Sequence, residues 1–171
     1  MKFLKRPAGL LLIAACFWAA GCSESGPKSA EAAKDGVAAD FKLPDLNGQP
    51  RTLQSYLSSH KAVLLNFWAT WCPPCREEIP GLINLQKKYG GAGFTVLGVS
   101  IGESQVKVAS FVGKEKINYP VLLDGDQGVA ETYHIVGIPT SYLIGSDGKI
   151  LGEYHAYTPD LVADVENAIQ A

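Results

Sequence analysis

The segment CPPC at residues 72–75 most constrains what this chain can fold into. Immediately before it, residues 63–68 (VLLNFW) form a nearly unbroken apolar run, which is typical of a strand buried on both faces. After it, residues 73–89 carry apolar side chains at helical spacing, with a kink expected at Pro80 and a Gly-Gly stop signal at 90–91. The pattern predicts a buried strand that leads directly into a helix, with both cysteines at the helix start.

Cysteines in this position have a definite chemistry. The macrodipole and free N–H groups of a helix N-terminus stabilise a thiolate, so Cys72 is predicted to be a nucleophile. Cys75 lies one turn further along the helix and is predicted to resolve a mixed disulfide formed on Cys72. A zinc site would need four ligands, usually from a second cysteine pair or a histidine pair, and the sequence has neither. A structural disulfide would not need a helix N-terminus behind two prolines, and chance spacing is the remaining alternative.

The rest of the pattern predicts one α/β domain over residues 37–171. A hairpin is expected over residues 41–53, with its turn at 47–48. Further strands are expected at residues 94–100, 121–123, 141–144 and 149–154, and further helices at 105–112, 129–134 and after Thr158-Pro159. The strand–helix–strand half implies a parallel strand pair, and the later hairpin adds antiparallel strands. We therefore expect a central mixed β-sheet flanked by helices on both faces, with an N-terminal β-hairpin extension.

Residues 1–21 have the features of an export signal: a basic start, an apolar run at 8–20 and small residues before Cys22. The small residues followed by cysteine resemble the bacterial lipobox, although Ala19 stands where leucine is usual. We expect Cys22 to carry a lipid, residues 22–36 to be a flexible tether and the domain to face the periplasm or the cell exterior. An ordinary cleaved signal or an uncleaved anchor is the alternative.

The charge of the chain argues against nucleic acid as a partner. There are 15 Lys and Arg against 17 Asp and Glu, a net charge of −2. Loss of residues 1–21 would remove three basic residues and no acids, which leaves 12 against 17 and a net charge of −5. An acidic body is repelled by anionic lipid, so acyl chains on Cys22 would have to hold it to the membrane.

Two motifs resemble the thioredoxin fold, namely FWATWCPPC at residues 67–75 and Ile138-Pro139-Thr140. With the hairpin and the tether, the chain is similar to the TlpA/ResA/CcmG group of extracytoplasmic thiol–disulfide oxidoreductases over about residues 37–171. The resemblance implies exchange chemistry through the cysteine pair itself, with no cofactor and no metal.

The resemblance also implies roles for residues around the pair. Pro139 should be cis and pack against the nucleophile, and the backbone of Ile138 should pair with a substrate strand. Trp71 should form an apolar collar beside the disulfide and contact substrate together with Pro73 and Pro74. A plain proline at the start of a strand is the alternative for Pro139.

Glu78 is the residue whose role the sequence leaves most open. Members of the group often carry an acid at this position, proposed to move protons at the active site. The buried aspartate of ordinary thioredoxins is replaced by Asn66, which cannot titrate, and this makes Glu78 the better proton carrier. If Glu78 is buried, its charge should raise the pKa values of the cysteines. The alternative is that Glu77 and Glu78 are acids in a first helical turn that favour the dipole.

The two prolines bear on the direction of electron flow. Pro73 and Pro74 lack N–H groups, so two donors that could face the Cys72 sulfur are absent. Less stabilisation of the thiolate predicts a reducing protein. The resemblance then implies disulfide-containing protein substrates, oxidised apocytochrome c among them, and a membrane thiol carrier as electron donor. We expect a monomer.

Three other functions are compatible with the same motif. A disulfide-introducing oxidase would differ only in redox potential. A thiol peroxidase usually has a threonine three residues before its reactive cysteine, where this chain has Ala69. A copper-delivery module could use Cys72, Cys75 and a histidine such as His134.

Overall fold

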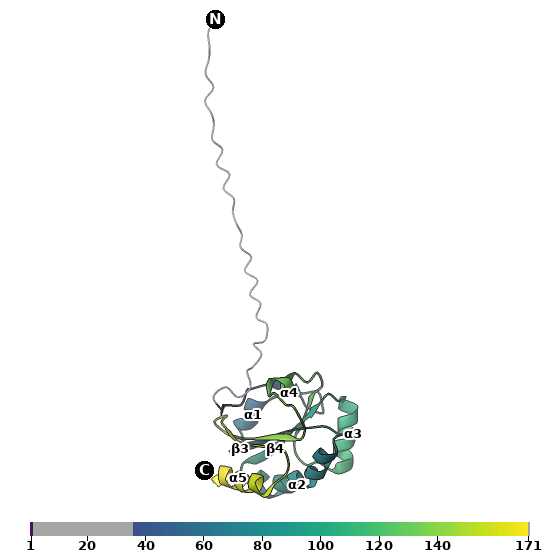
Figure 1. Ribbon diagram of the computed structural model, residues 1–171, viewed down its shortest axis with the longest axis vertical. Helices are drawn as coiled ribbons and strands as arrows, with labels where there is room; N and C mark the ends of the chain where they lie inside the picture. Colours follow the sequence, from purple (N-terminus) through teal and green to yellow (C-terminus); the bar gives the residue numbers. More distant parts are fainter. Residues whose placement is uncertain (2–35, 171) are drawn as a thin grey trace.

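A five-stranded mixed β-sheet forms the centre of the protein. The computed structural model describes Met1 and residues 36–170 (Figure 1). The predicted export signal, Cys22 and nearly all of the predicted tether lie outside these residues. The strand order is β5-β4-β3-β6-β7. The chain-order elements are β1 (Lys42–Pro44), β2 (Pro50–Thr52), α1 (Leu53–Leu57), β3 (Ala62–Trp68), α2 (Pro73–Tyr89), η2 (Gly90–Ala92), β4 (Phe94–Ile101), α3 (Gln105–Glu115), β5 (Val121–Asp124), α4 (Gly128–Thr132), β6 (Thr140–Gly145), β7 (Ile150–Tyr154) and α5 (Pro159–Gln170).

Strand β3 lies in the middle of the sheet and every one of its residues is buried. It pairs in parallel with β4 and antiparallel with β6, while β5 continues the parallel half and β7 the antiparallel half. The mixed sheet expected from the sequence is therefore confirmed. The continuous apolar run of β3 follows from its position, because both of its faces are covered by helices.

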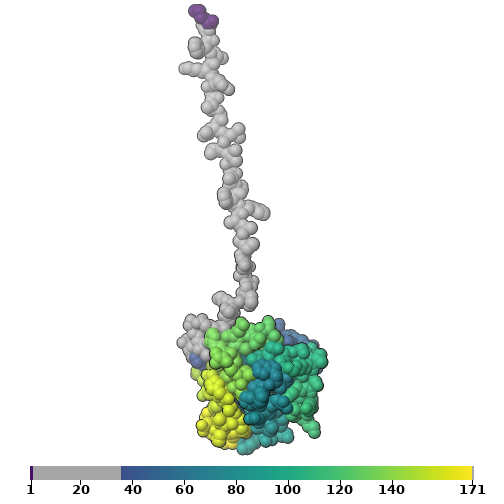
Figure 2. All heavy atoms as spheres, turned by 45° about the vertical axis from the view of Figure 1, so that its right-hand side comes forward, coloured from purple at the N-terminus to yellow at the C-terminus, as the bar shows by residue number. Residues whose placement is uncertain are grey.

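The helices form two layers, one on each face of the sheet. Buried side chains of α2, α3 and α5 pack with one set of sheet residues, and those of α1 and α4 pack with the other set. Figure 1 shows α1 and α4 above the sheet and α2 and α5 below it. In the space-filling view the yellow α5 lies beside the blue-teal start of α2 (Figure 2). Residues 69–72 join the end of β3 to the start of α2, so the N-terminus of α2 lies near the carboxyl end of β3.

The N-terminal hairpin is present, but it is shorter than the sequence predicted. Strands β1 and β2 pair antiparallel, and Asp45 closes the turn by accepting the N–H groups of Asn47 and Gln49. The prediction that Leu53 continues the second strand is wrong. Thr52 accepts the Ser55 N–H and so caps a helix that begins at Leu53.

Helix α2 has the predicted bounds, and it continues through Pro80, where the sequence predicts a kink. Pro80 is exposed, so the carbonyl that loses its N–H partner there lies on the solvent side of the helix. The first turn contains no acid. Glu77 and Glu78 therefore fall in the second turn, which weakens the helix dipole as an explanation for them.

Helices α3 and α4 end at residues other than those predicted, whereas α5 begins where it was expected. Helix α3 extends beyond residue 112 to Glu115, where Lys116 takes a left-handed conformation with φ of 54°. Helix α4 ends at Thr132, before His134, which has φ of 51°. Helix α5 begins at Pro159 as predicted, and Thr158 Oγ1 accepts the Leu161 N–H (3.3 Å).

Alanine substitutions at two glycines should change the free energy of unfolding in opposite directions. A Cβ added at Gly98 in β4 would lie 3.0 Å from Trp68 Nε1 and 3.3 Å from the Tyr119 ring, whereas one at Gly113 in α3 would meet nothing within 4 Å. Gly98→Ala should lower the free energy of unfolding by about 1–3 kcal/mol through overpacking. Gly113→Ala should raise it by about 0.5–1 kcal/mol through helix propensity. Denaturant unfolding of both variants checks this pair, and a Gly98→Ala variant as stable as wild type would contradict it.

Candidate active site

The two cysteines of the CPPC segment form a disulfide at the N-terminus of α2. The Cα atoms of Cys72 and Cys75 are 5.3 Å apart. Cys72 is the N-cap residue, Pro73 and Pro74 occupy the next two positions, and the Cys75 N–H donates to Cys72 Sγ (3.2 Å). Both cysteines are buried in the disulfide form, since Cys72 is 2% exposed and Cys75 is 0% exposed.

The segment before β6 faces the disulfide. The Ile138–Pro139 peptide bond is cis, the geometry expected from the sequence. The Ile138 carbonyl oxygen lies 3.6 Å from Cys72 Sγ. Thr140 fixes this segment by donating its hydroxyl to the Gly137 carbonyl (2.8 Å). The backbone of Ile138 therefore lies next to the sulfur of Cys72.

Glu78 is a buried acid one turn beyond Cys75, with 7% of its surface exposed. Asn66, in the middle of β3, donates from Nδ2 to Glu78 Oε1 (2.7 Å) and to Ser141 Oγ (2.9 Å). Burial raises the pKa of Glu78 from its ordinary value of 4.5 to about 7, and the Asn66 hydrogen bond only partly offsets this. Asn66 is thus a hydrogen-bonding strand residue, and Glu78 is a group that titrates near neutral pH.

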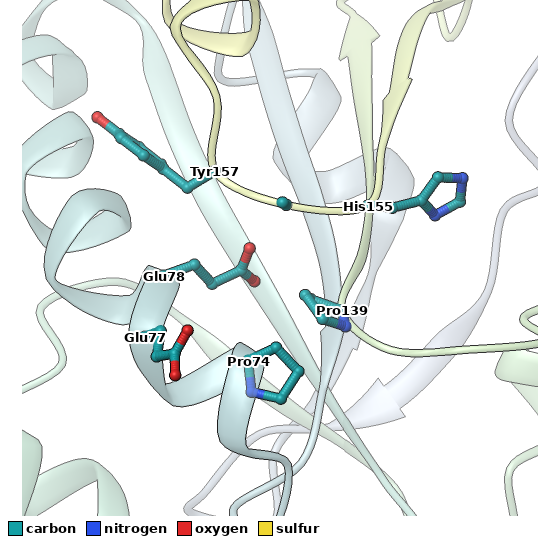
Figure 3. A pocket seen from close by; sticks show the side chains of 7 residues that line it. Pro74, Glu77, Glu78, Pro139, His155 and Tyr157 are labelled. Carbon is teal, nitrogen blue, oxygen red and sulfur yellow. The ribbon is translucent and has the colours of Figure 1, made fainter.

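A cavity of about 240 Å³ opens beside Glu78. Its lining comes from the start of α2, from Pro139 and from the segment after β7, namely Pro74, Glu77, Glu78, Pro139, His155, Ala156 and Tyr157. Figure 3 shows the Glu78 carboxylate pointing between Pro139 and Tyr157, while the His155 ring points away. The cavity therefore gives the buried acid a route to solvent next to the disulfide.

A second buried acid lies on the other side of the CPPC segment. Glu103, whose side chain is 2% exposed, accepts the Thr70 N–H (2.7 Å), the Thr70 hydroxyl (2.6 Å) and the Ser100 hydroxyl (3.2 Å). Lys107 pairs with the same carboxylate at 2.7 Å. Burial raises the pKa of Glu103, but the Lys107 and Thr70 hydrogen bonds outweigh it and hold the pKa below its usual range. Glu103 stays ionised over the pH range in which Glu78 gains and loses its proton, so only Glu78 is suited to exchange protons near neutral pH.

The structure brings most of the residues predicted for the site together. Trp71 is 61% exposed beside the disulfide, and Pro73 and Pro74 are exposed at the helix start. Val136, which the sequence interpretation did not single out, is also fully exposed, two residues before Ile138. The only feature of the sequence that could have marked Val136 is that it is an apolar residue directly before Gly137.

The interpretation also missed Thr70, Glu103, His155 and Tyr157. None of them carries a local signal, because their roles arise from contacts between segments distant in sequence.

His134 lies exposed in the segment after α4. Within residues 36–170, no three His, Cys, Asp or Glu side chains are grouped so as to hold a metal ion. In the same range, no helix has the length and apolar character to cross a membrane. Cys22 lies outside the described part of the chain.

Comparison with known proteins gives consistent results. The model of the AhpC/TSA family matches residues 35–152. A thiol-disulfide oxidoreductase of Bacillus subtilis named ResA is 38% identical over 114 residues, which are 67% of this chain and 63% of the relative. The chain thus spans slightly less than two thirds of the length of that curated relative.

Solved structures resemble the whole domain. A putative thiol:disulfide interchange protein DsbE from Chlorobium tepidum superposes with a TM-score of 0.70 at 29% identity and covers 82% of this chain and 96% of its own. The thioredoxin domain of a thiol-disulfide oxidoreductase from Bacteroides vulgatus gives a TM-score of 0.70 at 30% identity, with 78% and 95% covered. The expected thioredoxin-like fold is therefore confirmed.

Proposed function

The chain belongs to the AhpC/TSA family, and from that premise we propose that it is a thiol–disulfide oxidoreductase that reduces disulfides in extracytoplasmic proteins. The observation that carries the proposal is the Cys72–Cys75 disulfide at the N-terminus of α2, with Cys72 facing the Ile138 carbonyl at 3.6 Å. A helix N-terminus favours the thiolate, and the backbone of Ile138 beside it offers a place for an extended substrate.

The proposed reaction has two exchange steps. The Cys72 thiolate attacks one sulfur of a substrate disulfide, forms a mixed disulfide and releases the other substrate sulfur as a thiolate. Cys75 then loses its proton and attacks Cys72 Sγ, which closes the Cys72–Cys75 disulfide and releases the second substrate thiolate. Two electrons pass from the dithiol to the substrate. A separate dithiol must reduce the protein again, and we propose a membrane thiol carrier for this step.

Glu78 is the proposed proton acceptor for Cys75. It is three residues further along α2, so it lies about one turn away on the same side of the helix. A pKa of about 7 means that the carboxylate and the acid are both well populated at neutral pH. The cavity beside it would pass the proton on to solvent.

The reducing direction rests on how few donors face the nucleophile. Pro73 and Pro74 occupy the first two helical positions, so within the described residues the one hydrogen bond to Cys72 Sγ comes from the Cys75 N–H. Fewer donors stabilise the reduced thiolate less, which lowers the reduction potential. We propose export and lipid attachment at Cys22 on the sequence alone, and cytochrome c maturation as one context in which such a reductant acts.

The equilibrium reduction potential tests the proposal. Residues 23–171 are equilibrated in dithiol–disulfide buffers, the thiols are trapped, and the fraction reduced is measured at each buffer ratio. We expect a potential near about −270 mV, at the thioredoxin end of the known range. A value near about −120 mV would make the protein an oxidase and overturn the argument from the two prolines.

A further inference from the structure

We propose that Glu103 is a positioning residue that fixes the turn presenting Trp71 to a bound polypeptide, and that it thereby contributes to substrate docking and not to thiol chemistry. The proposal rests on the exchange function proposed above. It assigns a role to a buried acid that this exchange mechanism does not otherwise use.

The turn in question joins β3 to the cysteine pair. The Cys72 N–H donates to the Ala69 carbonyl (3.2 Å), so Thr70 and Trp71 are the two central residues of a four-residue turn. The side chain of Trp71 stands out from this turn, 61% exposed, while Thr70 is 7% exposed. The backbone at Thr70 therefore decides where the exposed indole points.

Glu103 holds the Thr70 backbone from a different segment of the chain. It lies just beyond the end of β4 and receives both the N–H and the hydroxyl of Thr70, at 2.7 and 2.6 Å. Two bonds from one residue to one carboxylate fix an orientation as well as a distance. Since β3 and β4 pair in parallel, their carboxyl ends lie at the same edge of the sheet, which puts the acid within reach of the turn.

Other groups complete the coordination of this carboxylate without contacting the turn. The Ser100 hydroxyl donates to Glu103 Oε2 at 3.2 Å. Lys107, in the first turn of α3, pairs with Glu103 Oε1 at 2.7 Å. A buried carboxylate is costly unless it is paired and hydrogen-bonded, and here every partner is in place. Because Lys107 balances its charge, Glu103 is suited to hold a fixed geometry and unsuited to exchange protons.

The nucleophile itself depends on different contacts. Cys72 Sγ is oriented by the Cys75 N–H and lies against Ile138, and neither contact involves Glu103. Loss of the clamp should therefore misplace Trp71 while leaving the sulfur reactive. A small disulfide needs only the sulfur, whereas a polypeptide also needs the surface around it.

The test compares two substrates on the reduced full-length chain. One is cystine, and the other is a synthetic peptide closed by a single disulfide and carrying extended apolar flanks. Glu103→Gln should raise the KM for the peptide by about tenfold, with kcat and the cystine rate within about twofold of wild type. Thr70→Val should act in the same direction, and Thr70→Ser, which keeps the hydroxyl, should restore the wild-type KM.

A matched control separates docking from simple loss of stability. Ser100→Ala removes one partner of the same carboxylate without touching the turn and leaves the Lys107 ion pair in place, so it should leave the peptide KM unchanged. An equal loss on peptide and cystine in Glu103→Gln, or no loss on either, would overturn the inference. A wild-type chain that reduces neither substrate would instead overturn the proposed function, so the two failures are distinguishable.

Discussion

Replacing Cys72 with serine should abolish reduction of substrate disulfides, leaving less than roughly 10⁻⁴ of the wild-type rate. A serine hydroxyl is not ionised near neutral pH and cannot carry the electron pair that a dithiol passes to a disulfide. The loss should appear in single-turnover assays of the reduced protein, because the first bond-forming step itself is removed.

Cys75→Ser is the matched control, because it removes the same intramolecular disulfide and changes the same atom three residues away. Cys72 keeps its place at the helix N-terminus in that variant, so the first exchange step should still occur. Without a resolving thiol the reaction should stop at the mixed disulfide, which non-reducing electrophoresis and intact-mass measurement detect. An adduct on Cys72→Ser, with none on Cys75→Ser, would reverse the assignment of nucleophile and resolving residue.

The cysteine pair could be predicted from the sequence because its geometry is local. A buried apolar run, a short connecting segment and a helical repeat follow one another along the chain, and these predict that the two cysteines lie at a helix N-terminus. The same holds for α5, whose start is marked by Thr158 and Pro159. Helix α1 was missed because Thr52 fits an alternating strand pattern as well as it fits a cap.

The contacts of the buried acids at the site could not be predicted from local sequence patterns. The pairing of Asn66 with Glu78 depends on how α2 lies across β3, and the sequence marked only the two partners as unusual. The clamp from Glu103 to Thr70 joins residues 33 positions apart and has no periodic signal. His155 and Tyr157 line the cavity only because the end of β7 returns to the start of α2. Such contacts are decided by the packing of distant segments.

Glu78→Gln should make the oxidised protein more stable by about 3 kcal/mol at pH 8 and above, and should leave its stability unchanged near pH 4. Burial raises the pKa of Glu78 from 4.5 to about 7, so the folded state binds this proton more tightly than the unfolded state. The unfolded chain ionises first as the pH rises. The wild type therefore loses stability between about pH 4.5 and 7, and then its stability levels off.

A glutamine at this position removes that loss. It keeps an oxygen that can accept the Asn66 hydrogen bond, and it has no charge to desolvate. The difference in unfolding free energy between variant and wild type, measured by denaturant at a series of pH values, should be close to zero in acid and rise through neutral pH. Groups other than Glu78 contribute equally to both proteins and cancel in the difference.

Glu77→Gln provides the control, because it removes a carboxylate from the exposed neighbouring position of the same helix. Its difference from wild type should stay within about 0.5 kcal/mol over the same pH range. In exchange assays, Glu78→Gln should also slow closure of the Cys72–Cys75 disulfide and remove its dependence on a group that titrates near pH 7, since Cys75 loses its proton acceptor. A stability difference that is flat with pH would show that Glu78 is not the buried titrating acid. A stability difference that rises as expected, with exchange unchanged, would leave Glu78 a buried acid with no part in proton transfer.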